Sequence, residues 1–303
     1  MRICSLLPSA TEILCSLGLA DQLVAVTHEC DYPSEITGLP RITRSSIPPG
    51  GSSRDVDTHI RQARHQGSSI YQLDERLLQE LDPDLILTQE LCDVCAVSYE
   101  TVQKAVRLLD GERRILSLEP TRVDEILMSI EQVGRHTGRE EAAANLVRDL
   151  RERLRRVASH ADGVRTRPRV LALEWFEPPF VGGHWVPEMI RLAGGLDLLG
   201  KAGSPSSEIS WQEVLRYDPE VVVGLPCGFD LEECLRGFET VPFPAGWENT
   251  QAHRSGRVYA VNASAYFNRP GPRIVEGLEI LGEILHPELF PPNPSSGRWR
   301  RLS

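Results

Sequence analysis

The segment LLQELDPDLILT, residues 77–88, contains the pattern that decides the fold: a helix end, an Asp-Pro-Asp turn and an apolar strand. Residues 214–224, VLRYDPEVVVG, repeat this pattern with Glu in place of the second Asp. A proline does not continue a helix, and a short apolar run after it is typical of a buried strand. The repeat therefore predicts two similar α/β halves.

The neighbouring strands of the two halves also correspond, in the same order. Residues 2–6, RICSL, match residues 169–173, RVLAL, and residues 114–118, RILSL, match residues 257–261, RVYAV. Because strands alternate with helices, the sheets should be mainly parallel. The predicted fold class is α/β, with two Rossmann-like lobes joined by one long α-helix.

The two lobes are expected at residues 1–120 and 164–290. Between them, in residues 121–163, apolar residues recur at helical spacing, which predicts a stiff linker helix with a candidate interruption near Gly134–Gly138. Residues 41–70 are polar and rich in Gly, Ser and Arg, as is typical of a functional flap or a mobile loop. The proline-rich residues 291–303 are predicted to form a disordered tail.

Composition excludes several classes of protein. The 303 residues are 41% hydrophobic and 25% charged, which is ordinary for a globular chain. With 43 acidic and 33 basic residues the net charge is −10, so a nucleic-acid partner is not expected. No apolar run reaches the roughly 20 residues needed to cross a bilayer, and the apolar part of residues 1–7 is too short for a signal peptide. The expected location is the cytoplasm, without membrane insertion.

The strand ends supply the candidate ligand-binding residues. In open parallel sheets, ligands bind beyond the carboxyl ends of the strands. We expect the two lobes to aim these ends at one shared cleft. The residues there are Pro8, Ser9, His28, Tyr32, Gln89 and Glu90 in the first lobe, and Trp175, Phe176, Phe180, His184, Trp185, Phe229, Tyr266, Phe267 and Asn268 in the second. No common enzyme signature is present, and no nucleophile stands beside a base, so no catalytic residue is predicted.

Four cysteines near these strand ends suggest an alternative. Cys92-x-x-Cys95 has the spacing of a metal or redox pair, and Cys30 and Cys227 follow other strands. A Zn²⁺ or iron–sulfur site is therefore one hypothesis, and a redox enzyme using Cys92 and Cys95 is another. A buried, inert thiol pair explains the same spacing equally well.

Several motifs resemble the helical-backbone periplasmic binding proteins, and in particular their cobalamin-binding branch. They are residues 3–13, ICSLLPSATEI; residues 24–27, VAVT; residues 31–33, DYP; residues 81–86, LDPDLI; and residues 265–274, AYFNRPGPRI. The resemblance covers about residues 1–287. It implies a two-lobe binder with one long connecting helix, little closure motion and a corrinoid between the lobes.

A corrin is a large, flat and mostly apolar ring edged with amides, which suits aromatic faces and scattered hydrogen-bonding groups. The expected ligand is therefore cobalamin or a related corrinoid. Ferric siderophores, haem and metal ions use the same scaffold in this family. The alternative function is a substrate-binding component of an ABC importer for metal chelates.

One departure from the family bears on its partners. Importer-linked members dock to a permease through an acidic residue on each lobe, and Asn268 occupies that position in the second lobe. Glu90 is the nearest match in the first lobe. The expected lack of an export signal and this departure together favour an intracellular store, chaperone or sensor over a permease-docked component.

Overall fold

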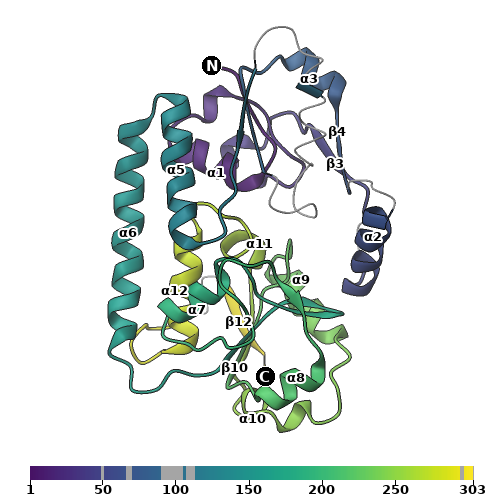
Figure 1. Ribbon diagram of the computed structural model, residues 1–303, viewed down its shortest axis with the longest axis vertical. Helices are drawn as coiled ribbons and strands as arrows, with labels where there is room; N and C mark the ends of the chain where they lie inside the picture. Colours follow the sequence, from purple (N-terminus) through teal and green to yellow (C-terminus); the bar gives the residue numbers. More distant parts are fainter. Residues whose placement is uncertain (49–50, 66–69, 90–104, 107–112, 294–296, 303) are drawn as a thin grey trace. The chain divides into compact units, whose positions relative to one another are not determined.

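In the computed structural model, the described residues are 1–48, 51–65, 70–89, 105–106, 113–293 and 297–302. They divide into two compact units, which are shown in Figure 1 and described separately below. The first comprises residues 1–51, 55–120 and 125–147. The second comprises residues 52–54, 121–124 and 148–303. The division falls inside a helix, whereas the sequence placed it at residues 120 and 164.

The described part of the first unit contains a parallel sheet of four strands in the order β2-β1-β5-β6. Its elements are β1 (Ile3–Ser5), α1 (Pro8–Ser16), β2 (Leu23–Ala25), β3 (Thr43–Ser45), α2 (Ser53–His65), β4 (Tyr71–Leu73), α3 (Glu75–Leu81), β5 (Leu85–Thr88), β6 (Arg114–Ser117), α5 (Val123–Thr137) and the start of α6 (Glu140–Asp162). Strands β1 and β5 are completely buried, as the apolar runs predict.

Residues 41–70 contain more regular structure than the sequence indicates. Strand β3 pairs antiparallel with β4 and forms a separate two-stranded sheet, and α2 lies between these strands in the chain. The polar composition of this segment concealed both, because β3 and β4 are only three residues long and α2 carries few apolar residues.

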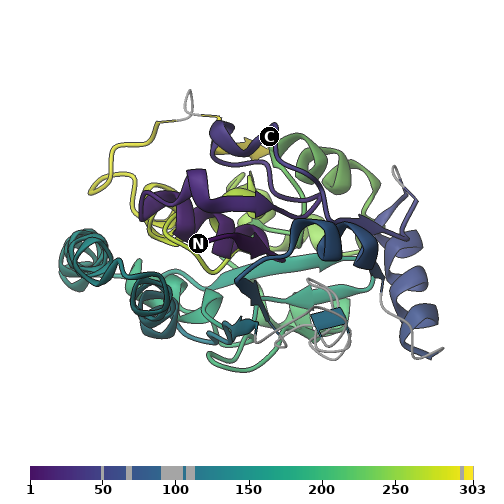
Figure 2. The ribbon, with the colours of Figure 1, turned by 90° about the horizontal axis from the view of Figure 1, so that it is seen from above.

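The predicted single linker helix is two helices, α5 and α6. Gly138, between them, has a φ of +67°, a left-handed conformation that ends a helix and favours glycine. A Cβ atom on Gly134 would lie 2.5 Å from Cβ of Ala143, so the two helices pack closely there. Figures 1 and 2 both show the start of α6 beside the end of α5. No helix of the described residues is both long enough and apolar enough to cross a membrane.

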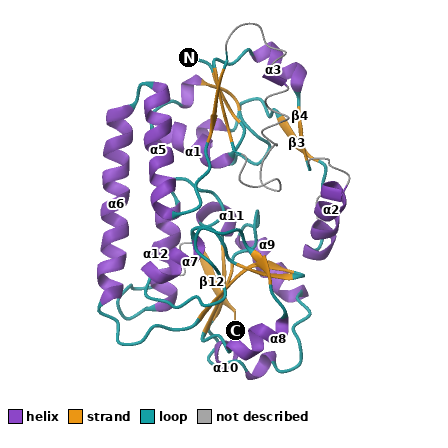
Figure 3. Ribbon diagram, viewed as in Figure 1, coloured by secondary structure: helices purple, strands orange, loops and turns teal. Residues whose placement is uncertain are grey.

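The described part of the second unit contains a mixed sheet of six strands in the order β12-β11-β10-β7-β8-β9. Its central strands β7, β10 and β11 are parallel. Helices lie on both sides of this sheet (Figure 3). Besides the rest of α6, its elements are β7 (Val170–Phe176), β8 (Pro179–Val181), α7 (Val186–Leu192), β9 (Ser207–Glu208), α8 (Trp211–Tyr217), β10 (Val221–Gly224), α9 (Leu231–Thr240), α10 (Gln251–Arg254), β11 (Val258–Val261), α11 (Ala263–Tyr266), α12 (Ile274–Leu285) and β12 (Trp299–Leu302).

The prediction of a disordered tail at residues 291–303 is wrong for its last residues. Strand β12 pairs antiparallel with β11, from Trp299 opposite Val261 to Leu302 opposite Val258. The indole of Trp299 is 6% exposed and donates a hydrogen bond to Glu283 on α12, at 2.8 Å. The proline-rich residues before β12 suggested disorder, but the strand is fixed by a partner far away in the sequence.

The sequence repeat is also a repeat of contacts. In the first unit, the guanidinium of Arg2 donates to the carbonyl of Leu81, and its backbone N–H donates to the carboxylate of Asp84 at 2.7 Å. In the second unit, the guanidinium of Arg169 donates to the carbonyls of Tyr217 and Asp218. Its backbone N–H donates to the carboxylate of Glu220 at 2.9 Å.

The turn itself has the same geometry in the two units. Asp82 and Asp218 end their helices with φ of 42° and 48°, a left-handed conformation that Asp tolerates better than most residues. Each turn therefore joins a helix to a buried strand in the same way. This equivalence confirms the two α/β halves.

Candidate functional site

The start of α1 follows the carboxyl end of β1. Pro8 and Ser9 are both buried at the first positions of the helix. The hydroxyl of Thr11, one turn further along, donates to Ser5 Oγ at 2.8 Å. Pro8 and Ser9 are therefore interior residues at the beginning of α1. Their contact with a ligand stays a prediction.

The loop after β2 carries His28 and Glu29, and the β3–β4 hairpin fixes both. Thr43 of β3 is 2% exposed, and its hydroxyl accepts a hydrogen bond from the backbone N–H of His28 at 3.1 Å. The hydroxyl of Tyr71, on β4, donates to Glu29 Oε1 at 2.6 Å. Arg41 donates to the carbonyls of Thr27 and Cys30 at 3.1 and 2.7 Å. The loop is thus held from its backbone and from its side chains.

The imidazole of His28 is held at one nitrogen. Nδ1 lies 2.7 Å from Thr43 Oγ1, and the ring centroid lies 5.3 Å from that of Tyr71. Nε2 is buried and has no hydrogen-bond partner among the described residues. Burial lowers the pKa of His28; the Glu29 carboxylate acts in the opposite direction and Arg41 lowers it further. The ring is therefore held in its neutral form more strongly than an exposed histidine.

The other predicted residues of the first unit differ in exposure. Gln89 follows β5 and is 7% exposed, whereas Tyr32 is 48% exposed. Glu90 lies outside the described residues. The carboxyl ends of β1, β2 and β5 are adjacent, because these strands are neighbours in one parallel sheet.

Four partly exposed aromatic side chains lie at or near strand ends in the second unit: Trp175, Phe180, Phe229 and Tyr266. The rings of Trp175 and Phe229 meet edge to face, with centroids 5.5 Å apart. The indole N–H of Trp175 donates to the carbonyl of Ser53 at 3.2 Å, and the Arg273 guanidinium lies 5.7 Å from the ring centroid of Tyr266. These rings are available as apolar faces for a ligand.

Three other predicted aromatic residues belong to the core of the second unit. Phe176, Trp185 and Phe267 are 1%, 6% and 0% exposed. A Cβ atom on Gly237 would lie 2.4 Å from the ring of Phe176, so α9 packs directly on that ring. The indole N–H of Trp185 donates to the carbonyl of Phe267 at 2.7 Å. These three buried side chains support the neighbouring strand-end loops from the interior.

His184 lies in a tight loop between β8 and α7. Its backbone N–H donates to the Ser204 carbonyl at 2.6 Å, and its carbonyl accepts from the Gly203 N–H at 2.8 Å. Its φ is +49°, in the left-handed region. Nε2 is buried without a hydrogen-bond partner in the described part of the chain, and burial lowers the pKa of the ring.

Asn268 fastens the loops after β10 and β11 to each other. In its better-satisfied orientation, the side-chain amide donates to the carbonyls of Pro226 and Ala263, at 3.2 Å each. An aspartate at this position would be unable to donate these bonds. Asn268 therefore has a structural use that an acidic docking residue does not provide.

Two cysteines of the predicted thiol cluster are described, and they belong to different units. Cys30 is 2% exposed, with Sγ 3.2 Å from the hydroxyls of Thr11 and Thr27, while Cys227 lies in the second unit and is partly exposed. Cys92 and Cys95 lie outside the described residues. In the described ranges, no group of three or more His, Cys, Asp or Glu side chains is arranged to hold a metal ion. The structure therefore gives no support to the Zn²⁺ or iron–sulfur hypothesis.

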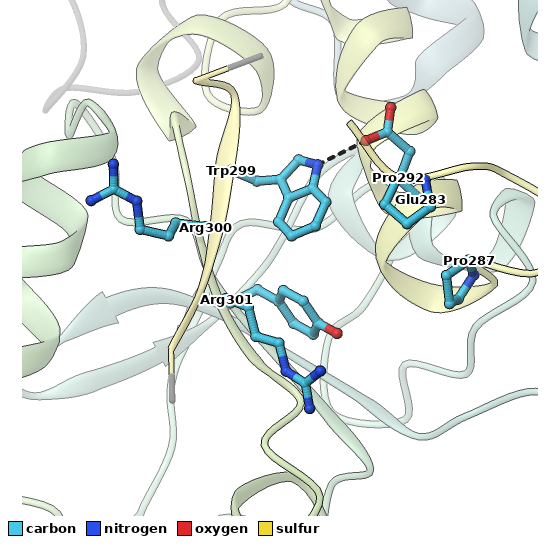
Figure 4. Close-up of a pocket in the computed structure, with 7 residues that line it drawn as sticks. Glu283, Pro287, Pro292, Trp299, Arg300 and Arg301 are labelled. Atoms are coloured by element: carbon cyan, nitrogen blue, oxygen red, sulfur yellow. Dashed lines mark hydrogen bonds between the residues drawn. The ribbon is translucent and has the colours of Figure 1, made fainter. Parts of the chain in front are cut away.

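A pocket of about 480 Å³ lies beside β11 and β12, and none of the predicted site residues lines it (Figure 4). Its polar groups already have partners within the protein. Glu283 accepts from Trp299 and Arg298, and Arg301 donates to the carbonyls of Ser255 and Gly256. This pocket is therefore a weaker candidate than the strand ends.

A family model described as periplasmic binding protein matches residues 3–265. The chain belongs to the periplasmic binding protein family. The vitamin B12-binding protein of Vibrio cholerae is 27% identical to it over 285 residues, which are 92% of this chain and 86% of that protein. These matches confirm the resemblance drawn from the motifs. Because the family consists of substrate-binding proteins, they also confirm a binding function in place of an enzymatic one.

Solved structures agree on the fold. The periplasmic vitamin B12 binding protein BtuF of Vibrio cholerae superposes with a TM-score of 0.69 at 24% identity, covering 94% of this chain and 96% of that one. The periplasmic heme-binding protein RhuT from Roseiflexus sp. RS-1 gives a TM-score of 0.70 at 23% identity, covering 95% of this chain and 98% of that one. Both likenesses show the α/β fold with two lobes.

Two residues of the first-unit site were missed by sequence reasoning. Thr43 belongs to the segment predicted as a flap, and Tyr71 directly follows that segment; they position His28 and Glu29. The available signal was the short TRS and YQL segments on either side of α2, which are too brief for periodicity to identify as strands.

Proposed function

We propose that this periplasmic binding protein family member binds cobalamin or a related corrinoid with strand-end side chains of both units. The observation that carries the proposal is the set of partly exposed rings in the second unit, led by the edge-to-face pair of Trp175 and Phe229. Flat apolar ligands are bound by such faces, with a few polar groups setting their orientation. The vitamin B12-binding relative from Vibrio cholerae adds support. A cleft between the lobes remains the predicted place of binding.

Haem is a second candidate ligand. Nε2 of His28, which has no hydrogen-bond partner in the residues that the structure describes, favours it, because a histidine nitrogen is a usual ligand of haem iron. The shared fold of the heme-binding protein RhuT is compatible with either ligand.

We also propose that the chain works in the cytoplasm as a corrinoid store, chaperone or sensor. Supporting observations are the free thiols of Cys4, Cys15 and Cys234, which suit a reducing compartment, and the use of Asn268 in the loop structure. The competing role is a substrate-binding component docked to an ABC permease. Fractionation of cells producing the natural full-length protein, with antibody detection, tests this. A membrane-associated or periplasmic pool that co-purifies with a permease would overturn it.

Titration of the purified full chain tests the ligand. Equilibrium dialysis against cyanocobalamin, cobinamide and haem, each at micromolar concentration, measures the affinity and the stoichiometry. We expect one corrinoid per chain with a dissociation constant in the micromolar range or below, and weaker binding of haem. Tighter binding of haem than of either corrinoid would transfer the proposal to haem, and no binding of corrinoid would overturn it.

A further inference from the structure

We propose that His28 is a direct ligand, through Nε2, to the metal of the bound chelate, with Thr43 as the positioning residue that orients its ring. This inference rests on the proposed function and specifies how the first unit recognises its ligand. It concerns the metal at the centre of a corrinoid, which is part of the cargo.

The first step concerns the free nitrogen. Nε2 of His28 is buried and unpartnered among the described residues. A buried polar atom without a hydrogen bond costs about 1–3 kcal/mol, and such atoms in folded proteins often mark a missing ligand or a functional role. His28 follows β2, at the sheet edge where ligands of open parallel sheets bind. The unpaired atom is thus located where a ligand is expected.

The second step concerns the other nitrogen. Nδ1 lies 2.7 Å from the hydroxyl of Thr43, which is 2% exposed. The same hydroxyl accepts the backbone N–H of His28 at 3.1 Å, so one atom of the β3–β4 hairpin fixes both the main chain and the ring. Histidines that bind metals usually donate their second ring N–H to such a partner, which sets the tautomer and the ring orientation.

The third step concerns the protonation of the imidazole and the balance of atoms and electrons in the ligand exchange. Only a neutral imidazole has a lone pair for a metal. With aquocobalamin, the Nε2 lone pair forms the cobalt–nitrogen bond and the bound water leaves. The ring proton then lies on Nδ1 and is donated to Thr43 Oγ1. No electron is transferred.

His184 provides a matched comparison in the second unit. Its Nε2 is also buried without a partner in the described ranges, and burial also lowers its pKa. The hydrogen bonds found at His184 involve its backbone, and in the described part of the chain no side chain holds Nδ1. Both histidines therefore have a buried Nε2, but among the described residues only the ring of His28 is held by a side chain. For this reason His184→Ala is the control for His28→Ala.

The experiment compares aquocobalamin with cyanocobalamin, whose cyanide already occupies the axial position. Visible absorption reports axial ligation, and equilibrium dialysis reports binding. For the wild type and H184A we expect the aquocobalamin spectrum to shift to that of an imidazole-coordinated form. For H28A we expect no shift and about tenfold or greater loss of aquocobalamin affinity, with a clearly smaller loss of cyanocobalamin affinity. Thr43→Ala should weaken ligation, and Thr43→Ser should restore it.

The outcomes separate this inference from the proposed function. Corrinoid binding by the wild type without a spectral shift, or a shift that persists in H28A, overturns the role of His28 and leaves corrinoid binding standing. A shift that is lost only in H184A assigns the ligand to the second unit and overturns the proposal. If neither corrinoid binds, both the inference and the proposed function fail.

Discussion

Arg2 and Arg169 make equivalent contacts at the amino ends of β1 and β7, while the loops at the carboxyl ends of the two sheets differ in chemistry. In the first unit, a hairpin from another part of the chain holds an imidazole and a carboxylate by hydrogen bonds. In the second unit, the corresponding edge presents aromatic rings that meet each other edge to face. The repeated turn fixes the scaffold, and the strand ends are where the two halves have diverged.

This difference indicates that the two units contribute to ligand binding in different ways. Hydrogen-bonded polar groups define direction, because donors and acceptors must align within a narrow range of distance and angle. Aromatic faces supply area and tolerate sliding. We therefore expect substitutions in the second unit to reduce affinity for all flat ligands, and substitutions in the first unit to change which axial chemistry is accepted.

The largest expected effect comes from the aromatic pair. Trp175→Ala removes a partly exposed ring and should weaken corrinoid binding by about 2 kcal/mol, or roughly thirtyfold, for aquocobalamin and cyanocobalamin alike. The control is Trp211→Ala, because Trp211 packs on Phe243 at 5.4 Å within α8 and its surroundings. Equilibrium dialysis measures both. Equal losses in the two variants would contradict a ligand-binding role for Trp175.

The next effect tests the equivalence of the two turns. Arg169→Ala removes hydrogen bonds from a guanidinium that is 33% exposed and should lower the free energy of unfolding by about 2 kcal/mol. Arg2→Ala removes the matching bonds at an exposed position and should cost about 1 kcal/mol. Urea unfolding followed by circular dichroism measures both changes. A larger loss in the Arg2 variant would break the proposed equivalence.

The smallest effect is a dependence on pH. The unfolded chain takes up a proton at His28 near pH 6.5, whereas the folded chain resists it because the pKa is lowered by burial. Stability should therefore fall as the pH drops below about 6.5, by up to about 1.4 kcal/mol per pH unit for this one group. His28→Gln should make the decline shallower between pH 7 and pH 5 in urea titrations. An unchanged slope would show that His28 does not titrate differently on folding.

Much of the scaffold was predictable because its signals are local. The Asp-Pro-acid turns identified two halves, and their apolar runs identified buried strands such as Leu85–Thr88. The strand-end rule also selected His28 and Trp175 for attention. This rule gives no information on which side chains are buried. Phe176 and Phe267 have the same residue type as Phe229, yet only the structure shows that they fill the core.

The errors came from interactions between segments distant in sequence. Strand β12 exists through its pairing with β11, and the role of Thr43 depends on a hairpin that folds back onto the loop after β2. The linker is interrupted at one glycine, Gly138, which has a left-handed backbone conformation. The amino-acid composition of the segment does not by itself determine that conformation. The metal-binding role predicted for Cys30 stays a prediction; what the sequence did not show is that its thiol contacts the hydroxyls of Thr11 and Thr27 in the interior.

Strand β12 has a consequence for association between molecules. It is the outermost strand of its sheet in the described part of the chain, so one row of its peptide groups faces away from β11. Such a row is a template on which another polypeptide adds a strand, and charged side chains along it oppose that addition. Arg300 and Arg301 supply this charge at its centre. Their positive charge opposes the pairing of this strand with further copies of the chain in a fibril, whether or not a ligand is bound.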